Sequence, residues 1–298
     1  MSNPLPAGLP ASSSTEPQAS AGPPPRLTAR FWGVRGSIPT PQAGFLGVGG
    51  NTSCVEVRAP DGTVLVLDAG TGVRALGYAL AAEAAGEPMH VHLALSHFHW
   101  DHLQGLPFFA PLFAAGHEVS FYAVTDDNRL DRLLQGQMCF PYFPVPFDAL
   151  AAATQTVSLR EGEPFQVGPM TVRPFPVNHP QGAHGFRIEC GGATLVYATD
   201  YEHGDPAFDA GLREFVRGAD VLISDAQYTP DEYALRGGWG HTTWEKAAEL
   251  ASEAGVGRLF LFHHDPAHDD AALARICACA REVFPASELA CEGEEVRL

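Results

Sequence analysis

The sequence predicts an α/β domain built of two mixed β-sheets that pack together and carry helices on their outer sides. Two observations predict this fold class. From about Leu27 onward, short β-rich runs alternate with glycine turns. Strands come first, then a helix, and then strands and helix again, so the order of elements predicts two similar halves.

The strand candidates are short segments rich in β-branched and aromatic residues, a composition that suits a pleated sheet surface. They cover residues 28–34, 54–59, 63–70, 91–96, 118–124, 170–177, 186–190 and 194–200, and a further apolar strand lies within 257–266. Several helix candidates begin after Thr or Asp, and some end at Gly, as capped helices do. They cover residues 72–86, 127–138, 242–255 and 269–284.

Composition divides the chain into a tail and one domain. Residues 1–26 are rich in Pro, Ser and Ala and predict a disordered tail, because they cannot bury enough apolar surface. Residues 27–298 form the predicted domain, and the 45% hydrophobic content of the 298-residue chain supports a sizeable core. No apolar run approaches the roughly 20 residues that span a bilayer, so we expect no membrane partner.

Charge and cysteine content limit the partners and the compartment. The net charge of −17 argues against a large nucleic-acid partner, which normally requires clustered Lys and Arg. A small anionic substrate stays allowed, because bound metal ions can dominate the local field. The N-terminus has no basic leader before an apolar block, and the six cysteines show no CxxC spacing. We therefore expect a cytoplasmic protein with reduced thiols.

Three features allow two interpretations each. Residues 135–150, QGQMCFPYFPVPFDAL, are rich in aromatic residues and prolines, which excludes a central strand or a helix interior. They predict a packed surface loop, which we favour slightly, or a flap over a binding site. Arg35 is either a phosphate contact or an exposed turn residue. The glycine turn at 49–51 either lines a site or simply connects two strands.

The segment Ser96–Gly105, SHFHWDHLQG, carries three histidines and an aspartate directly after an apolar strand. Alternation along an extended stretch puts His97 and His99 on one side, which suits joint ligation of one ion. Asp101 and His102 follow as the chain turns into a helix and can reach a second ion. Chance is a poor explanation for this spacing, so the segment predicts half of a metal site.

Other apolar strands end in the same residue types. His179 follows the strand at 170–177, Asp200 ends the strand at 194–200, and the doublet His263–His264 ends a further apolar run. Four apolar strands that all end in His or Asp form a pattern that ordinary polar turns do not explain. We therefore predict that these residues complete the metal site.

SHFHWDH with downstream His, Asp and His resembles the metallo-β-lactamase superfamily, across almost the whole chain after the tail. The resemblance implies an αββα four-layer sandwich with a dinuclear site between its sheets. It implies one metal held by His97, His99 and His179, a second held by Asp101, His102 and His263, and Asp200 bridging both. His263 is preferred to His264 because it matches the ligand position in related strand ends. This ligand set suits Zn²⁺ and also admits Mn²⁺ or Fe.

The ligands narrow the branch of the superfamily. True β-lactamases commonly carry Cys where Asp200 stands, and flavodiiron proteins carry Glu in place of His99, so both activities are disfavoured. Glyoxalase-type thioesterases share the seven ligands and stay open. GWGHTTWEKAAELASEAGVGRLFLFHH resembles the tRNase Z and phosphodiesterase branch, in which a histidine, here His241, acts on the scissile phosphate or leaving group. LISDAQYTPDEY resembles the preceding segment, whose acidic residue, here Asp225, orients that histidine.

Within that branch, FWGVRGSIPTP, GGNTSCVEV, LDAGTG, WDHLQGLPFF and LFHHDPAHDD resemble bacterial hydrolases near the phosphoribosyl cyclic phosphodiesterases. The resemblance implies that residues 27–298 hydrolyse a small anionic phosphodiester, of cyclic nucleotide or cyclic phosphate type, with a hydroxide that bridges two metal ions. His241, Asp225 and Asp101 are the implied catalytic residues. The alternatives are a thioesterase or lactonase, a tRNase Z-like ribonuclease, and a non-catalytic metal-binding module. The resemblance also allows a homodimer.

Overall fold

Two seven-stranded β-sheets pack face to face in the computed structural model, which describes residues 26–126 and 129–298. The strand order of the first sheet is β14 (Glu295–Arg297), β1 (Thr28–Gly33), β2 (Cys54–Arg58), β3 (Val64–Leu67), β4 (His90–Ala94), β5 (Glu118–Val124) and β6 (Ala153–Leu159). The order of the second sheet is β13 (Ser287–Leu289), β12 (Arg258–Phe262), β11 (Val221–Asp225), β10 (Ala193–Ala198), β9 (Ala183–Cys190), β8 (Met170–Val177) and β7 (Phe165–Val167).

Both sheets are mixed in the same way, which confirms the predicted two similar halves. In the first sheet, β14, β1, β2 and β3 pair antiparallel, and β3 to β6 pair parallel. In the second sheet, β7 to β10 pair antiparallel, and β10 to β13 pair parallel. The last strand of the chain, β14, pairs with β1 at the edge of the first sheet, so the C-terminal end of the chain completes the sheet formed by the N-terminal half.

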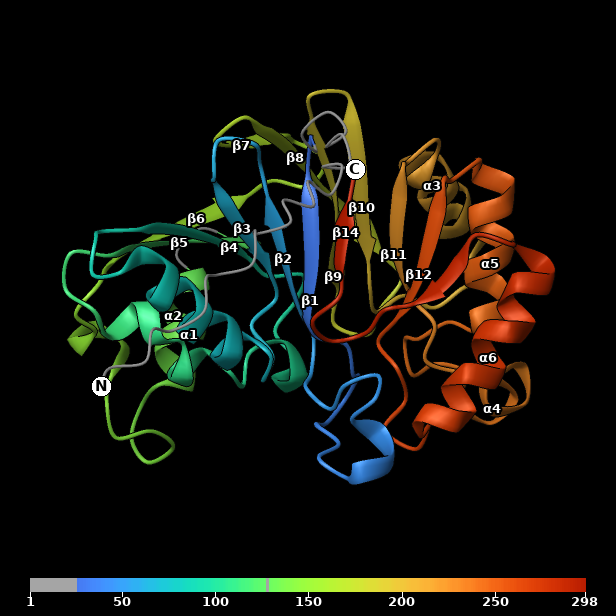
Figure 1. Ribbon diagram of the computed structural model, residues 1–298, viewed down its shortest axis with the longest axis horizontal. Helices are drawn as coiled ribbons and strands as arrows, with labels where there is room; N and C mark the ends of the chain where they lie inside the picture. Colours follow the sequence, from blue (N-terminus) through green and yellow to red (C-terminus); the bar gives the residue numbers. More distant parts are fainter. Residues whose placement is uncertain (1–25, 127–128) are drawn as a thin grey trace, which may run out of the picture.

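Helices cover the outer side of each sheet, which completes the four layers (Figure 1). The first sheet carries α1 (Val73–Ala84) and α2 (Arg129–Gln137). The second carries α3 (Pro206–Val216), α4 (Pro230–Arg236), α5 (Trp244–Ala254) and α6 (Asp270–Val283). Short 3₁₀ turns connect several elements: η1 (Ala43–Phe45), η2 (Trp100–His102), η3 (Leu106–Phe108), η4 (Ala110–Phe113) and η5 (Phe147–Ala149). None of the described helices is long and apolar enough to cross a membrane.

Strand alternation explains why the sheets are covered on both faces. Along β3, Leu65 and Leu67 belong to the core between the sheets, whereas Val64 and Val66 belong to the core beneath α1. Successive side chains of a strand point to opposite faces, so a run of four apolar residues must bury both. Aromatic rings join the sheets across the central core, where Phe31 on β1 lies 5.4 Å from Phe260 on β12 between ring centroids.

The predicted helices and strands are present, and seven further elements were not predicted. The helices at 72–86, 242–255 and 269–284 are α1, α5 and α6. The helix at 127–138 is α2 from Arg129 onward; residues 127–128 lie outside the described residues, as do 1–25 of the predicted tail. The sequence did not predict α3, α4, β6, β7, β11, β13 and β14. Three of these strands have only three residues, and β6 reads ATQTVSL, so their apolar patterns are too short or too weak to recognise.

Candidate metal centre

The histidines and aspartates predicted from the sequence meet at one edge of the sandwich. Three groups of described side chains offer ligand atoms that, within each group, all lie within 4.8 Å of one another; one of them, Asp200, Asp225, His241 and His263, shares two residues with another, and the other two contain the predicted ligands. The first group is His97, His99 and His179, and the second is Asp101, His102, Asp200 and His263. Each follows the carboxyl end of a strand: β4 precedes the 97–102 segment, and β8, β10 and β12 precede the other three residues. Carboxyl ends of parallel strands meet at one edge of a sheet, which is where ligand sites form.

Backbone conformation aims these side chains. Six non-glycine residues of the described chain have positive φ, and five of them surround the centre: Ser37, Asp68, Gln181, Asp200 and His263. Their φ values run from 55° to 68°, in the left-handed region that costs free energy for residues with a Cβ. Such conformations persist where the surrounding structure enforces them, and they cluster at functional sites.

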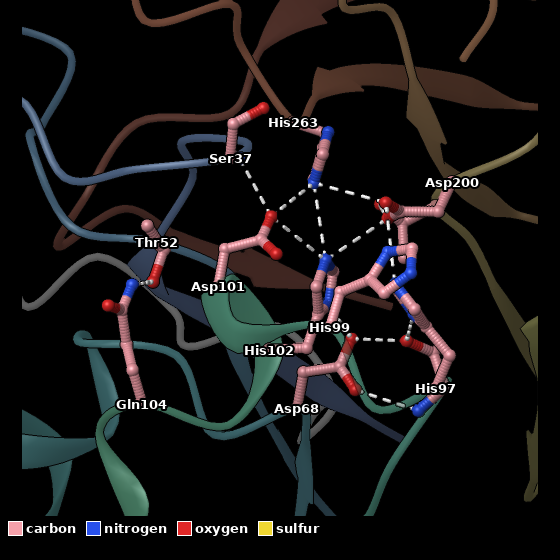
Figure 2. Close-up of polar contacts among 12 residues, drawn as sticks. Ser37, Thr52, Asp68, His97, His99, Asp101, His102, Gln104, Asp200 and His263 are labelled. Carbon is pink, nitrogen blue, oxygen red and sulfur yellow. Dashed lines mark hydrogen bonds and ion pairs between the residues drawn. The ribbon is translucent and has the colours of Figure 1, made fainter. Parts of the chain in front are cut away.

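Hydrogen bonds at the outer nitrogen set the tautomer of His102 and His263. The Nδ1 of His102 donates to Oδ2 of Asp68 at 2.8 Å, as drawn in Figure 2. The Nδ1 of His263 donates to the side-chain oxygen of Gln227 at 2.8 Å. Because each neutral imidazole carries one N–H, the Nε2 of both rings presents a lone pair toward the other ring.

The same argument applies to His97 and His179. The Nδ1 of His179 donates to the carbonyl oxygen of Gly240 at 2.8 Å. The hydroxyl of Ser96 donates to Asp68 at 2.7 Å, so it accepts from Nδ1 of His97 at 3.0 Å. Both Nε2 atoms therefore carry lone pairs, and that of His97 is buried without any hydrogen-bond partner. A buried nitrogen lone pair without a partner costs free energy, and a bound cation would satisfy it.

His99 directs its other ring nitrogen, Nδ1, toward the centre. Its Nε2 donates to the side-chain oxygen of Gln181 at 3.1 Å, and its Nδ1 lies 3.2 Å from Nε2 of His179. Two lone pairs at this distance repel each other unless a positive charge lies between them. The three imidazoles thus form a set of nitrogen donors that suits a metal ion.

Distances in the second group match a tetrahedral metal site. The Nε2 atoms of His102 and His263 lie 3.2 Å apart, and each lies 3.2–3.3 Å from Oδ2 of Asp101. The Nε2 of His102 also lies 3.3 Å from Oδ2 of Asp200, and that of His263 lies 3.3 Å from Oδ1 of the same carboxylate. Four donors that each bind one Zn²⁺ at its usual bond length form a tetrahedron with edges of roughly 3.3–3.4 Å. The residues present therefore fit a divalent metal, and Figure 2 shows them converging.

Asp200 stands between the two groups. Its Oδ1 lies 3.8 Å from Nε2 of His97 and 3.3 Å from Nε2 of His263. Burial raises the pKa of the Asp200 carboxyl, but His263, His102 and His97 outweigh that effect and hold the pKa well below its usual range. Burial lowers the pKa of the His97 imidazole well below its usual range. Ionised carboxylate and neutral imidazole are the forms that bind metal.

His241 and Asp225 form a pair beside these groups. The Nδ1 of His241 donates to Oδ2 of Asp225 at 2.9 Å, and Asp225 is completely buried at the end of β11. Asp225 also accepts from the backbone N–H of Asp200, Gln227 and Thr242, so its carboxylate is held at four points. Burial lowers the pKa of His241, but Asp225, then Asp200 and Asp101, outweigh burial and raise it to about 9.

A cavity of 530 Å³ opens above the centre. Its lining consists of Ser37, Phe98, His99, Trp100, Asp101, Gln181, Asp200 and His241. The described lining contains no lysine or arginine. Trp100 is 82% exposed although it is large and apolar. The cavity therefore combines the predicted ligands His99, Asp101 and Asp200 with an exposed aromatic residue, Trp100.

All nine site residues predicted from the sequence thus converge; their individual roles stay predictions. His263 rather than His264 joins the second group, while His264 bonds the carbonyl of Ala290 at 3.1 Å. Both interpretations of Arg35 are wrong: it is fully buried, and its guanidinium donates to the carbonyls of Gly49 and His268. No residue of 135–150 lines the cavity, and Phe147 is buried against the outer core.

The residues that hold the ligands in place were not predicted from the sequence. Asp68, Gln227 and Gln181 each bond the outer nitrogen of a histidine, and the backbone N–H of Ser37 donates to Asp101 at 2.7 Å. Asp68 alone had a recognisable signal, because it ends the apolar strand TVLVLDAG as Asp200 ends TLVYATD. An isolated glutamine or a backbone N–H has no such signal in sequence.

Comparison with known proteins agrees with this geometry. The family model of the β-lactamase superfamily domain matches residues 63–264. An uncharacterized protein of Mycobacterium leprae is 33% identical over 219 residues, which cover 70% of each chain. The probable metallo-hydrolase YhfI of Bacillus subtilis is 28% identical over 217 residues, which cover 69% of this chain and 78% of YhfI.

Two solved structures share the fold. The crystal structure of YhfI from Bacillus subtilis aligns with a TM-score of 0.70 at 22% identity, covering 91% of this chain and 99% of that one. A diphosphatase of the PhnP family aligns with a TM-score of 0.65 at 20% identity, covering 92% and 98%. The family match over residues 63–264 and the mycobacterial relative show that this chain belongs to the β-lactamase superfamily, as a metallo-hydrolase.

Proposed function

We propose that this metallo-hydrolase is a phosphodiesterase that binds two divalent ions and cleaves a small phosphodiester of cyclic nucleotide or cyclic phosphate type. One observation carries the proposal. His241, which is hydrogen-bonded to the buried Asp225, lines the same cavity as members of both ligand groups, so a proton donor and a metal centre can act on one substrate. The homodimer and the cytoplasmic location expected from the sequence remain part of this proposal.

The two groups of ligands would hold the ions. His97, His99 and His179 would bind one ion, and Asp101, His102 and His263 the other, with Asp200 shared. Histidine-rich ligation with carboxylates suits Zn²⁺ and also admits Mn²⁺ or Fe. Divalent ions bound there would polarise a phosphoryl oxygen and supply a water nucleophile of lowered pKa.

His241 would act on the leaving group. Asp225 accepts from its Nδ1 and so leaves Nε2 for the cavity. In the protonated imidazole, Nε2 gives its proton to the departing alkoxide oxygen as the P–O bond breaks, and Asp225 stabilises the charge before transfer. Such general-acid help is worth roughly 10²–10⁴-fold in rate.

The cavity supports a small substrate with one negative charge. Its described lining has no lysine or arginine, so only the metal centre and His241 offer positive charge to a phosphate. A diester carries one charge, whereas a diphosphate or a long nucleic-acid backbone would place further charges against Asp101 and Asp200 or outside the cavity. The exposed ring of Trp100 at the mouth can stack on a planar group such as a nucleobase.

A substrate panel with metal analysis tests this proposal. We expect two divalent ions per chain and hydrolysis of bis-p-nitrophenyl phosphate and of 2′,3′- or 3′,5′-cyclic nucleotides. Acyl thioesters and lactones in the same panel represent the alternative use of the centre on a carbonyl. If the two-ion protein cleaves thioesters or lactones and no phosphodiester, the thioesterase or lactonase assignment replaces ours.

The role of His241 has its own test. His241→Ala should keep both ions, since the His241 side chain hydrogen-bonds to Asp225 and to none of the six unshared ligands. It should slow diesters with alkoxide leaving groups by roughly 10²–10⁴-fold, and nitrophenyl diesters far less, because nitrophenolate departs without a proton. Equal slowing of both substrates would exclude the proton-donor role.

A further inference from the structure

The turn between α4 and α5 lies beside the centre. It reads Gly237-Gly238-Trp239-Gly240 and leads directly into His241. Gly238 and Gly240 have φ values of 87° and 88°, which residues with a side chain rarely adopt. A turn with three glycines has little conformational preference of its own, so its shape must be set by contacts from outside.

One carboxylate makes those contacts. Glu202 accepts from the backbone N–H of Gly238 at 2.7 Å through Oε1 and from that of Gly240 at 2.9 Å through Oε2. The hydroxyl of Tyr233 on α4 donates to the same Oε1 at 2.9 Å. Glu202 lies two residues after Asp200, in the segment that joins β10 to α3. The carboxylate therefore ties the turn to the end of β10.

The turn 237–240 orients His179. The carbonyl of Gly240 accepts from Nδ1 of His179 at 2.8 Å, which leaves Nε2 for metal. Glu202 also fixes the other side of this histidine through its backbone: its N–H donates to the carbonyl of Asn178 at 2.7 Å, and the side-chain amide of Asn178 donates back at 3.0 Å. His179 thus lies between two segments that Glu202 joins.

We propose that Glu202 is a positioning residue, which sets the orientation of His179 as a metal ligand and the place of His241 through the turn 237–240. This inference rests on the proposed function only for the role of His241; its effect on His179 concerns metal binding alone. Partners that orient a ligand from outside typically account for 10- to 100-fold in metal affinity or activity. Glu202 does not contact His179 through its carboxylate; it would act on this ligand indirectly, by holding the turn whose Gly240 carbonyl accepts from His179.

Zinc titration against a competing chelator tests the proposal in the full-length protein. Glu202→Gln keeps the size of the side chain, but its NH₂ group faces the N–H of Gly238 or Gly240, so one of the two contacts is lost. We expect the affinity of the site formed by His97, His99 and His179 to fall by roughly 10- to 100-fold, with the other site within about 3-fold of wild type. Glu214→Gln is the matched control, because it removes an exposed carboxylate on α3.

A second variant protects the test against misfolding. Tyr233→Phe keeps the carboxylate and removes only the hydroxyl that donates to Glu202, and we expect a fall of roughly 2- to 5-fold at the same site. Wild-type affinity at both sites in Glu202→Gln would overturn the proposal, and so would an equal loss at both sites with a lower melting temperature of the metal-free protein. Zinc binding without any phosphodiesterase activity would refute the proposed function and leave this test intact.

Discussion

At the scale of single residues, the centre depends on which nitrogen of each histidine carries the proton. Asp68 is the most connected of the residues that decide this. Its Oδ2 accepts from Ser96, His102 and Tyr197 at 2.7–2.8 Å, and its Oδ1 accepts from the backbone N–H of Ser96. One fully buried carboxylate therefore orients His102 directly and His97 through Ser96.

Asp68→Asn should weaken metal binding although it changes few atoms. An amide has one acceptor oxygen where the carboxylate has two, so at least one of the four donors meets an NH₂ group. We expect zinc affinity to fall by roughly 10- to 100-fold, measured by chelator competition. The control is Asp61→Asn, which removes an exposed carboxylate between β2 and β3. Unchanged zinc affinity in Asp68→Asn would show that the tautomers are set without this charge.

Trp100→Ala tests the aromatic mouth of the cavity. Stacking on an aromatic ring contributes to base binding by an amount equal to roughly 5- to 100-fold in affinity. We expect the preference for a cyclic nucleotide over a base-free ribose cyclic phosphate, measured as a ratio of kcat/KM, to fall by that factor. Tyr78→Ala, which alters an exposed aromatic residue on α1, should leave the ratio unchanged. An unchanged ratio in Trp100→Ala would mean that the ring does not contact the base.

At the scale of elements, strand ends and one glycine turn place the ligands. A residue in left-handed conformation follows each of β3, β10 and β12: Asp68 and His263 come directly after their strands, and Asp200 comes two residues after β10. The reversal in φ turns the chain out of the sheet, and the side chain then faces the neighbouring strand ends. The turn before α5 contributes by close approach of its backbone, because Gly240 has no side chain to separate it from His179.

Gly240→Ala should therefore disturb the centre. A Cβ at this position would lie 2.3 Å from Nδ1 of His179 and 2.3 Å from Cδ of Pro180. Gly238→Ala is a matched control, since its φ is nearly the same and a Cβ there meets nothing within 4 Å. Both variants carry about 1–2 kcal/mol of backbone strain. Only Gly240→Ala should also lose zinc affinity, by about tenfold or more; equal zinc binding by the two would contradict the close approach.

At the scale of the whole molecule, the centre joins the two halves of the chain. Asp101 and His102 follow β4 of the first sheet, whereas His179, Asp200 and His263 follow strands of the second. Burial lowers the pKa of His102, but the carboxylates of Asp200, Asp101 and Asp68 around it outweigh burial and raise that pKa well above its usual value. Three carboxylates around one imidazole concentrate negative charge at this point, and a bound cation would offset it.

Metal removal should therefore lower the stability of the whole molecule. An ion that binds only the folded state stabilises it by about 2.7 kcal/mol per site when its free concentration is 100 times the Kd. We expect a chelator to lower the melting temperature in calorimetry, and zinc to restore it. In Asp101→Ala the restoration should be smaller, because one ligand of the second group is gone. The same melting temperature with and without zinc would argue against an ion shared by both halves.

Much of the fold and of the centre follows from local sequence. Apolar runs of four to eight residues predicted nine of the strands, and helix caps predicted four of the helices. Spacing within SHFHWDH placed His97, His99, Asp101 and His102 together, because residues so close in sequence cannot lie far apart in space. The strand ends then supplied His179, Asp200 and His263, since polar residues that follow buried strands lie together at the edge of the sheet.

The tertiary structure decided what depends on residues distant in sequence. The resemblance already preferred His263 to His264, and the tertiary structure places His263 in the second group while His264 donates to the carbonyl of Ala290. Arg35 is buried because carbonyls of the 45–49 loop and of His268 surround it, and no local pattern encodes that environment. The tertiary structure likewise determined that Asp68, Gln227, Gln181 and Glu202 lie where they can orient the histidines, because each acts on a segment distant from it in sequence. The sequence by itself determined which side chains can bind metal; the assembled sheets determined which nitrogen and which oxygen each one presents, because hydrogen bonds between distant segments set those orientations.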